Sequence, residues 1–122
     1  AEGLLWSCAR ENVMSWATWF DGALFTNPGV SAVILDTGIL PAGDRKILLI
    51  VSASVGLEVI LERRNADNDA TLQDKIFPVT LSQATFTIPR LSVSRNERLR
   101  VITRAAVTGE VEASIFLGIP GD

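Results

Sequence analysis

The sequence predicts an all-β protein, an antiparallel β-sandwich of the jelly-roll type with about eight strands and an N-terminal arm. Turn residues recur at short intervals along the 122 residues, and the segments between them are rich in Val, Ile, Leu, Thr and Phe. Short strands at such spacing are typical of sandwiches and barrels. Eight strands around one core suit two sheets packed face to face, and the length fits one domain.

The turns divide the chain into its expected strands. They fall at Asn27-Pro28-Gly29, Pro41 to Asp44, Asn65 to Asp69, Ser94 to Asn96, and Thr108-Gly109. We expect strands near residues 15–25, 31–36, 45–54, 56–64, 73–80, 84–89, 97–106 and 110–118. Residues 15–122 therefore form a single β-sandwich (jelly-roll) domain, and residues 1–14 form the N-terminal arm.

The arm and the start of the first strand leave two interpretations open. Apolar residues from Trp6 to Phe20 recur in steps of three and four, as on one side of a helix, and those from Met14 to Phe20 also alternate as in a strand. We expect a mainly extended arm that leads into the first strand, with a short helix as the alternative.

Two middle strands differ in pattern. The run Ile47–Val51 is apolar at every position, so something must cover both of its faces. A central strand under a terminal arm meets this need, and so does a neighbouring subunit. In the next strand Leu57, Val59 and Leu61 point inward, which leaves Ile60 as a lone apolar residue on the opposite face.

The last two strands are expected to pair as a hairpin. Both alternate, and the loop Val107-Thr108-Gly109 between them suits a hairpin closure. In that register Leu99 lies opposite Leu117, and Arg104 meets Glu112 as a cross-strand ion pair.

Composition removes several classes of function. The chain has no histidine and one cysteine, so the commonest general base is missing and a zinc site is improbable. We expect no catalytic residue, no metal, no cofactor and no enzyme activity. The net charge of −3 argues against nucleic-acid binding. No apolar run approaches the length of a membrane helix. We expect no intact signal peptide, and we expect Cys8 to be a small buried residue of a protein made in a reducing cytoplasm.

Three local patterns have a functional and a plain interpretation. Residues 65–74 resemble a calcium loop but lack its glycine and its bidentate glutamate, so a solvated acidic loop is preferred. The three tryptophans suit stacking on a sugar ring, although burial in a core or interface is the preferred interpretation. The row of Arg98, Arg100 and Arg104 suits either an interface or a solvated face paired with nearby glutamates.

Several stretches from Pro41 to Leu117 carry a resemblance to a known family. They are Gly43-Asp44-Arg45-Lys46-Ile47, the segment LEVILERRN from Leu57 to Asn65, and NERLRVITRAAVTGEVEASI from Asn96 to Ile115. This pattern resembles small jelly-roll cement (decoration) proteins of tailed bacteriophage capsids. The resemblance implies a virion structural protein, made in the host cytoplasm, that binds the outer capsid surface and stabilises the shell by bridging neighbouring capsomers.

The implied partners are the major capsid protein and the chain itself, as a homodimer or homotrimer, with no nucleic acid and no membrane. We expect subunit or capsid contacts from the aromatic residues Trp6, Trp16, Trp19 and Phe20, and polar bridging from Arg98, Arg100 and Arg104. The alternative is a sugar- or receptor-binding head domain of a viral fibre or spike. A His-free enzyme or ligand-binding β domain is a third possibility, and it requires a deep polar pocket.

Overall fold

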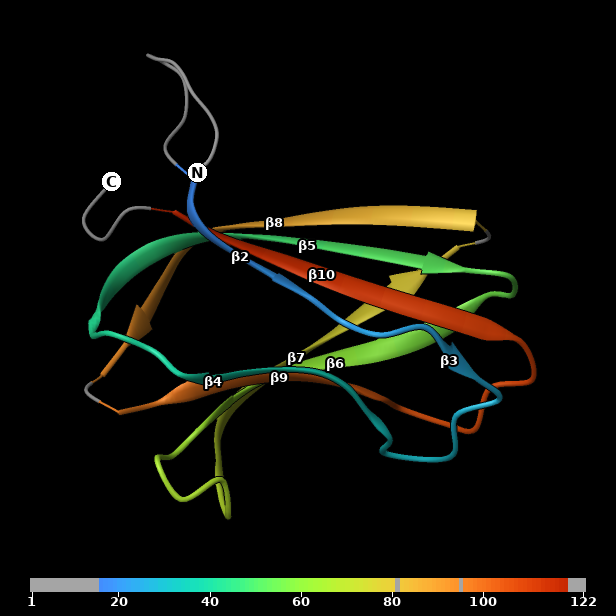
Figure 1. Cartoon of the computed structure of the whole chain (residues 1–122), viewed down its shortest axis with the longest axis horizontal. Coiled ribbons are helices and arrows are strands. Elements are labelled where there is room, and N and C mark those ends of the chain that lie inside the picture. Colours follow the sequence, from blue (N-terminus) through green and yellow to red (C-terminus); the bar gives the residue numbers. More distant parts are fainter. Residues whose placement is uncertain (1–15, 81, 95, 119–122) are drawn as a thin grey trace.

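A computed structural model describes residues 16–80, 82–94 and 96–118, so the predicted arm, residues 1–14, lies outside the described residues. The described chain forms two antiparallel sheets that pack face to face (Figure 1). The strands are β2 (Trp16–Asp21), β3 (Phe25–Thr26), β4 (Val33–Ile39), β5 (Gly43–Ala53), β6 (Leu57–Arg64), β7 (Thr71–Val79), β8 (Ser82–Val93), β9 (Arg98–Thr103) and β10 (Glu110–Gly118). The predicted all-β sandwich is confirmed.

The pairing of the strands is nested. One sheet has the order β2-β10-β5-β8, with the short β3 also on β10, and the other has the order β4-β9-β6-β7. Along the sequence, the hairpin β6–β7 is enclosed by the pair β5–β8, that pair by β4–β9, and that pair in turn by β2–β10. Successive pairs alternate between the two sheets, which is the arrangement of a jelly roll.

The core lies between the sheets and follows the predicted alternation. Every second residue of β5, β6, β9 and β10 points inward, and side chains such as Leu49, Val59, Val101 and Ile115 are fully buried. Burying a side chain of this size stabilises the fold by roughly 2 kcal/mol. The inward positions predicted for Val59 and Leu61 are confirmed.

The predicted hairpin of the last two strands is wrong. β9 pairs with β4 and β6, whereas β10 pairs with β2 and β5, so Leu99 and Leu117 lie in different sheets. The connection crosses the end of the sandwich, where the Val107 N–H donates to the Pro28 carbonyl at 2.9 Å. Gly109 is needed there because a Cβ atom would lie 2.6 Å from the Ser54 hydroxyl.

The run Ile47–Val51 lies in a central strand, because β5 pairs with β10 on one side and with β8 on the other. Within the described residues, the opposite sheet covers one face of this run. Its odd-numbered residues are buried in the core, while Leu48 and Ile50 lie half-buried on the outer face of the sheet. The prediction of a central strand is confirmed. The predicted cover by the arm concerns residues outside the described range.

Candidate functional site

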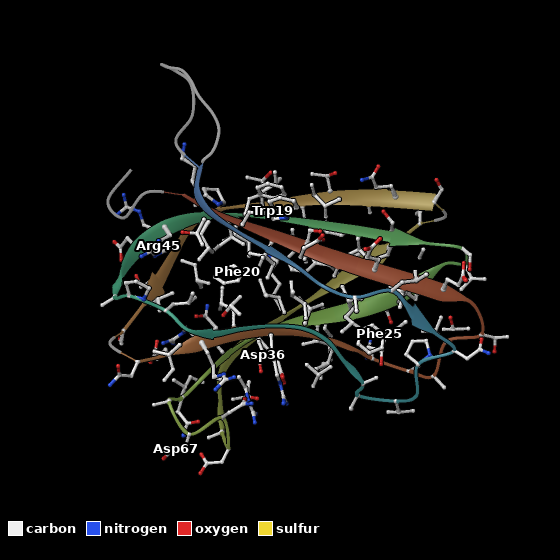
Figure 2. All side chains as sticks on the ribbon, viewed as in Figure 1. Trp19, Phe20, Phe25, Asp36, Arg45 and Asp67 are labelled. Carbon is white, nitrogen blue, oxygen red and sulfur yellow. The ribbon has the colours of Figure 1, made fainter. Side chains whose placement is uncertain are left out.

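The outer face of the five-stranded sheet, which is turned away from the core, carries an aromatic pair. Trp19 on β2 and Phe116 on β10 are register partners, and their rings stack with centroids 5.7 Å apart and planes within 3° of parallel. The Trp19 side chain is nevertheless 59% exposed, and it lies above the sheet (Figure 2). Phe116 therefore supports one face of the indole and leaves much of the ring open to solvent.

Strand alternation explains why the neighbouring aromatic residue behaves differently. Phe20 points to the opposite face from Trp19 and packs against the core (Figure 2). The backbone of Trp16 pairs with Gly118 in the same strand pair, and Trp6 lies outside the described residues. Of the aromatic contact residues predicted, the structure thus presents Trp19 at the surface of the single chain. Burial of Trp19 in the core is wrong, whereas its burial in an interface stays a prediction.

Hydrogen-bonding side chains surround the aromatic pair. Asp21, two residues along β2 from Trp19, accepts a hydrogen bond from the Ser114 hydroxyl at 2.6 Å. In the strand register, the row that begins with Trp19 and Phe116 continues through Leu48 of β5 to Thr87 of β8. The row that begins with Asp21 and Ser114 continues through Ile50 of β5 to Thr85 of β8, and both threonines are exposed. We call this surface the aromatic face: Trp19, Asp21, Leu48, Ile50, Thr85, Thr87, Ser114 and Phe116.

The predicted arginine row lies on the other sheet, where each member has an acidic partner. Arg98 binds Asp36 at 3.0 Å, and Arg104 binds Glu58 at 2.9 Å. Arg100 donates to the carboxylate of Glu62.

The predicted Arg104–Glu112 pair is wrong, because β10, which carries Glu112, lies in the opposite sheet. The row is thus paired within its own sheet, by acids from β4 and β6 that are distant in sequence. Pairing within the sheet leaves these guanidinium groups less free to bridge to another molecule.

The loop between β6 and β7, which resembled a calcium site, is held by hydrogen bonds between its own residues. The Asn65 side-chain oxygen accepts hydrogen bonds from the N–H groups of Asp69 and Ala70, and its amide nitrogen donates to the Asp69 carboxylate at 2.6 Å. Within residues 16–80, 82–94 and 96–118, no group of three or more His, Cys, Asp or Glu side chains is placed to hold a metal ion. In this part of the chain, no helix is long and apolar enough to cross a membrane.

A pocket of about 400 Å³ opens at the end of the sandwich, between residues 55–58 and 104–108. Val55, Leu57 and Val107 contribute apolar walls. Of the residues that line it, the charged ones are Glu58 and Arg104, and they bind each other. The pocket therefore offers a ligand little unpaired polar chemistry, and the aromatic face is the stronger candidate.

Two solved structures whose descriptions name carbohydrate-binding modules have a fold similar to that of this chain. A structure described as "CBM4 structure and function" matches with a TM-score of 0.56 and 10% identity, over 76% of this chain and 66% of the other. A second, "BiXyn10A CBM1 APO", matches with a TM-score of 0.52 and 9% identity, over 85% of this chain and 91% of the other. The chain thus spans slightly less than two thirds of the first module, and the likeness concerns the fold. No protein-family model and no curated protein matches the sequence.

Proposed function

We propose that this protein is a sugar-binding β-sandwich domain that holds a glycan on the aromatic face. The observation that carries the proposal is the exposed Trp19 ring, supported from one side by Phe116. A large aromatic side chain in this position loses hydrophobic stabilisation unless something covers it. The similarity of the fold to carbohydrate-binding modules supports the same assignment.

The face supplies the two kinds of contact that a pyranose ring needs. The apolar C–H face of a sugar stacks on an aromatic ring, and its hydroxyl groups need donors and acceptors beside that ring. Asp21 lies about 7 Å along the strand from Trp19, because two residues of a strand advance by that distance. Its carboxylate retains acceptor capacity beyond the bond from Ser114. Trp19 therefore serves as the stacking platform, and Asp21, Ser114 and the threonines of β8 serve as hydrogen-bonding groups.

The charge of the face favours a neutral glycan. Asp21, Glu110 and Glu112 lie on or beside the outer side of the β2–β10 pair, and the whole chain carries a net charge of −3. A uronate or sialic acid carboxylate placed among these groups would be repelled. We expect uncharged polysaccharides to bind better than acidic ones of similar length.

Affinity electrophoresis against a panel of neutral and acidic polysaccharides tests the proposal, followed by calorimetric titration of any polymer that retards the protein. Replacing Trp19 by Ala removes the platform without touching the core. Loss of stacking on one aromatic ring costs roughly 1–3 kcal/mol, so we expect Kd to rise by about five- to 150-fold. Trp19→Phe keeps a ring and should retain part of the affinity.

Leu24→Ala is the matched control, because Leu24 is similarly exposed but lies in the β2–β3 connection away from Phe116. It should bind as the wild type does. The proposal fails if no glycan in the panel or on an array binds, or if Trp19→Ala binds as tightly as the wild type.

Capsid decoration is the second candidate. The strand order favours it, because the jelly roll is the architecture of many viral shell proteins as well as of lectins. In this case the protein lies on the capsid surface and contacts the major capsid protein. Cosedimentation with expanded phage heads tests it, with a raised melting temperature of the heads as the expected result. Protein that stays in the supernatant at high concentration contradicts it.

A further inference from the structure

β8 lies at one margin of the five-stranded sheet (Figure 1). Among the described residues it pairs with β5 and with no other strand. A strand at such a margin presents a row of main-chain N–H and C=O groups that can pair with another chain. The first seven residues of β8, 82–88, read SQATFTI and include no charged residue, no proline and no glycine. We call residues 82–88 the open edge.

Two backbone hydrogen bonds establish which residues of this sheet bond to which neighbouring strand. The Gly22 N–H donates to the Ala113 carbonyl, so the odd-numbered residues of β10 direct their main-chain groups to β2 and the even-numbered ones to β5. The Ser54 N–H donates to the Glu110 carbonyl, which continues the β5–β10 register and gives the same alternation. The even-numbered residues of β5 are therefore bonded to β10, and the odd-numbered ones to β8.

The same alternation leaves three residues of the open edge with outward main-chain groups. Odd-numbered residues of β5 are register partners of even-numbered residues of the open edge, as Leu49 is of Phe86, so these even-numbered residues bond to β5. The N–H and C=O groups of Gln83, Thr85 and Thr87 thus point away from the sheet, and the side chains of these residues are exposed. The open edge therefore offers its hydrogen-bonding groups to a partner that is itself an extended strand.

The other edge strands of the sandwich carry features that oppose pairing with a further strand. Charged residues, prolines, bulges and short length are the means by which natural sheets protect their edges. β7 has Asp74, Lys75 and Pro78, and proline has no N–H to donate. β4 has Asp36 and an irregular register with β9, and β2 has six residues against the twelve of β8. The open edge has none of these features.

We infer that the open edge pairs with the open edge of a second copy of this chain, antiparallel, about a two-fold axis that passes beside Thr85 and is perpendicular to the sheet. In this register Thr85 lies opposite Thr85 of the second copy, and Gln83 lies opposite Thr87 of the second copy. All these residues have outward main-chain groups, so each pair exchanges two hydrogen bonds. The arrangement is the same from either copy, as a two-fold interface requires.

The side chains of the open edge are complementary to themselves in this register, which identifies the occupant. On the side toward the core, Ala84 lies opposite Phe86 of the second copy, and Ser82 lies opposite Ile88 of the second copy, so each large side chain meets a small one. An axis beside Ala84 or Phe86 would instead set small against small or large against large. Ala84, Phe86 and Ile88 are partly buried against the core, and the second copy covers more of their apolar surface.

Charge and order also favour a second copy over a flexible peptide. The open edge has no charged residue, so two copies meet without like charges opposite each other. Both copies are already extended strands held by β5, so pairing fixes little additional backbone, whereas a flexible peptide must be ordered residue by residue. A second copy is therefore the occupant that loses the least conformational entropy.

The pairing joins two five-stranded sheets into one continuous sheet. Its order is β2-β10-β5-β8 followed by β8-β5-β10-β2 of the second copy, and the perpendicular axis keeps both aromatic faces on the same side. The two Trp19 rings then lie about 34 Å apart, seven strand spacings of about 4.8 Å. This consequence rests on the proposed function: a polysaccharide long enough to reach both faces should bind the dimer more tightly than the monomer.

Sedimentation equilibrium over about 1 µM to about 1 mM tests the pairing, because one strand pair buries less than the roughly 800 Å² per partner of a standard interface and gives a weak dimer. Thr85→Pro removes one outward N–H from each copy and leaves the hydrogen bonds to β5 in place, and proline is tolerated on edge strands. We expect it to raise the dimer Kd at least about tenfold. Thr85→Val is the matched control, since it keeps the N–H and the branched shape, and it should dimerise as the wild type does. A wild type that stays monomeric, or a folded Thr85→Pro that dimerises as tightly as the wild type, overturns the inference.

Disulfide trapping in a Cys8→Ser background tests the register and does not depend on the proline variant. The Cα atoms of a hydrogen-bonded antiparallel pair lie about 5.5 Å apart, within the range that a disulfide spans, so Thr85→Cys should cross-link to its copy under mild oxidation. Thr87→Cys is the matched control, because its copy lies about four residues farther along the strand, roughly 13 Å away, and it should not cross-link on its own. A mixture of Gln83→Cys and Thr87→Cys should form the mixed disulfide. Equal cross-linking of Thr85→Cys and Thr87→Cys, or a mixture that forms no mixed disulfide, overturns the register.

Failure of the dimer and failure of sugar binding stay distinguishable. Both experiments are done without glycan, so their outcome does not depend on the proposed function. Trp19→Ala should lose glycan binding and keep the wild-type dimer Kd, because Trp19 lies on β2, at the far margin of the sheet from the open edge. A Trp19→Ala variant that is folded and loses the dimer as well contradicts the open edge as the place of pairing.

Discussion

Glu97 closes the turn between β8 and β9 with a single carboxylate oxygen. This oxygen accepts a hydrogen bond from the Ser94 N–H at 2.8 Å and another from the Arg63 guanidinium at 2.6 Å. Burial by itself raises the pKa of Glu97, but the Ser94 bond and the Arg63 charge outweigh it, and the net result is a lowered pKa. The charged form is therefore the one that the fold stabilises.

Replacing Glu97 by Gln should make the pH dependence of unfolding shallower. A lowered native pKa contributes stability above the unfolded pKa, and this contribution is lost as the pH falls through the native pKa. At neutral pH we expect Glu97→Gln to lower the free energy of unfolding by about 1.5–3 kcal/mol, the contribution of a hydrogen bond to a charged group. Urea unfolding, repeated from neutral pH into the acid range, measures the difference in the free energy of unfolding between the wild type and Glu97→Gln. This difference should become smaller as the pH falls, and a difference that grows contradicts the lowered pKa of Glu97.

Trp19 shows how far the candidate site was predictable from the sequence. The aromatic residues near the N-terminus were identified as contact residues, but their two faces were not separated, because helical and extended patterns both fitted the segment. Phe116 was not identified at all. Its role depends on the pairing of β2 with β10, two strands that come from opposite ends of the chain. No local sequence pattern shows that these two strands are neighbours.

At the scale of elements, the sequence predicted the strands better than their partners. Alternation and turn residues placed most strands within about four residues of their observed bounds, and they identified the inward residues Val59 and Leu61 of β6 correctly. The single strand expected at residues 15–25 is wrong, because the structure has two strands there, β2 and β3. The expectation that Ile60 is a lone apolar residue on the outer face is also wrong, because an isoleucine lies beside it on each neighbouring strand. The β9–β10 hairpin was wrong because a period of two reveals which side of a strand is buried and not which strand lies beside it. A short connection with a glycine serves a hairpin and a crossing between sheets equally well.

The end of β2 is fixed by a backbone contact at Gly22. The Gly22 N–H donates to the Ala113 carbonyl at 2.8 Å. A Cβ atom at this position would lie 2.5 Å from the carbonyl oxygen of Ile34 and 2.8 Å from that of Ala113. Those two carbonyl groups belong to strands of different sheets, so β2 passes closely over the junction between them.

Gly22→Ala should therefore destabilise the protein, since backbone atoms on two strands must move to admit the methyl group. We expect a loss of about 2 kcal/mol or more in the free energy of unfolding. Gly29→Ala is the control, because nothing lies within 4 Å of its Cβ position, and it should change stability by less than about 1 kcal/mol. Denaturant unfolding measures both, and equal stabilities of the two variants contradict the close contact.

At the scale of the whole molecule, the nested pairing imposes an order on folding. Residues 65–70 are all that separates β6 from β7, whereas residues 22–109 separate β2 from β10. Closing the longer loop directly costs roughly 2 kcal/mol more in chain entropy than closing the shorter one. Once β6–β7 has formed, each surrounding pair begins from strands already brought near each other, so pairing should proceed outward and end at β2–β10.

Pulsed hydrogen exchange during refolding tests this order. We expect amides of β6 and β7 to gain protection first and those of β2 last, with overall folding in roughly milliseconds to seconds because most contacts are non-local. The aromatic face depends on the outermost pair, since Trp19 rests on Phe116 across it. Binding competence should therefore appear with the protection of β2 and not with that of the core. Protection of β2 and β10 before that of β6 and β7 would show that folding begins at the outer pair instead.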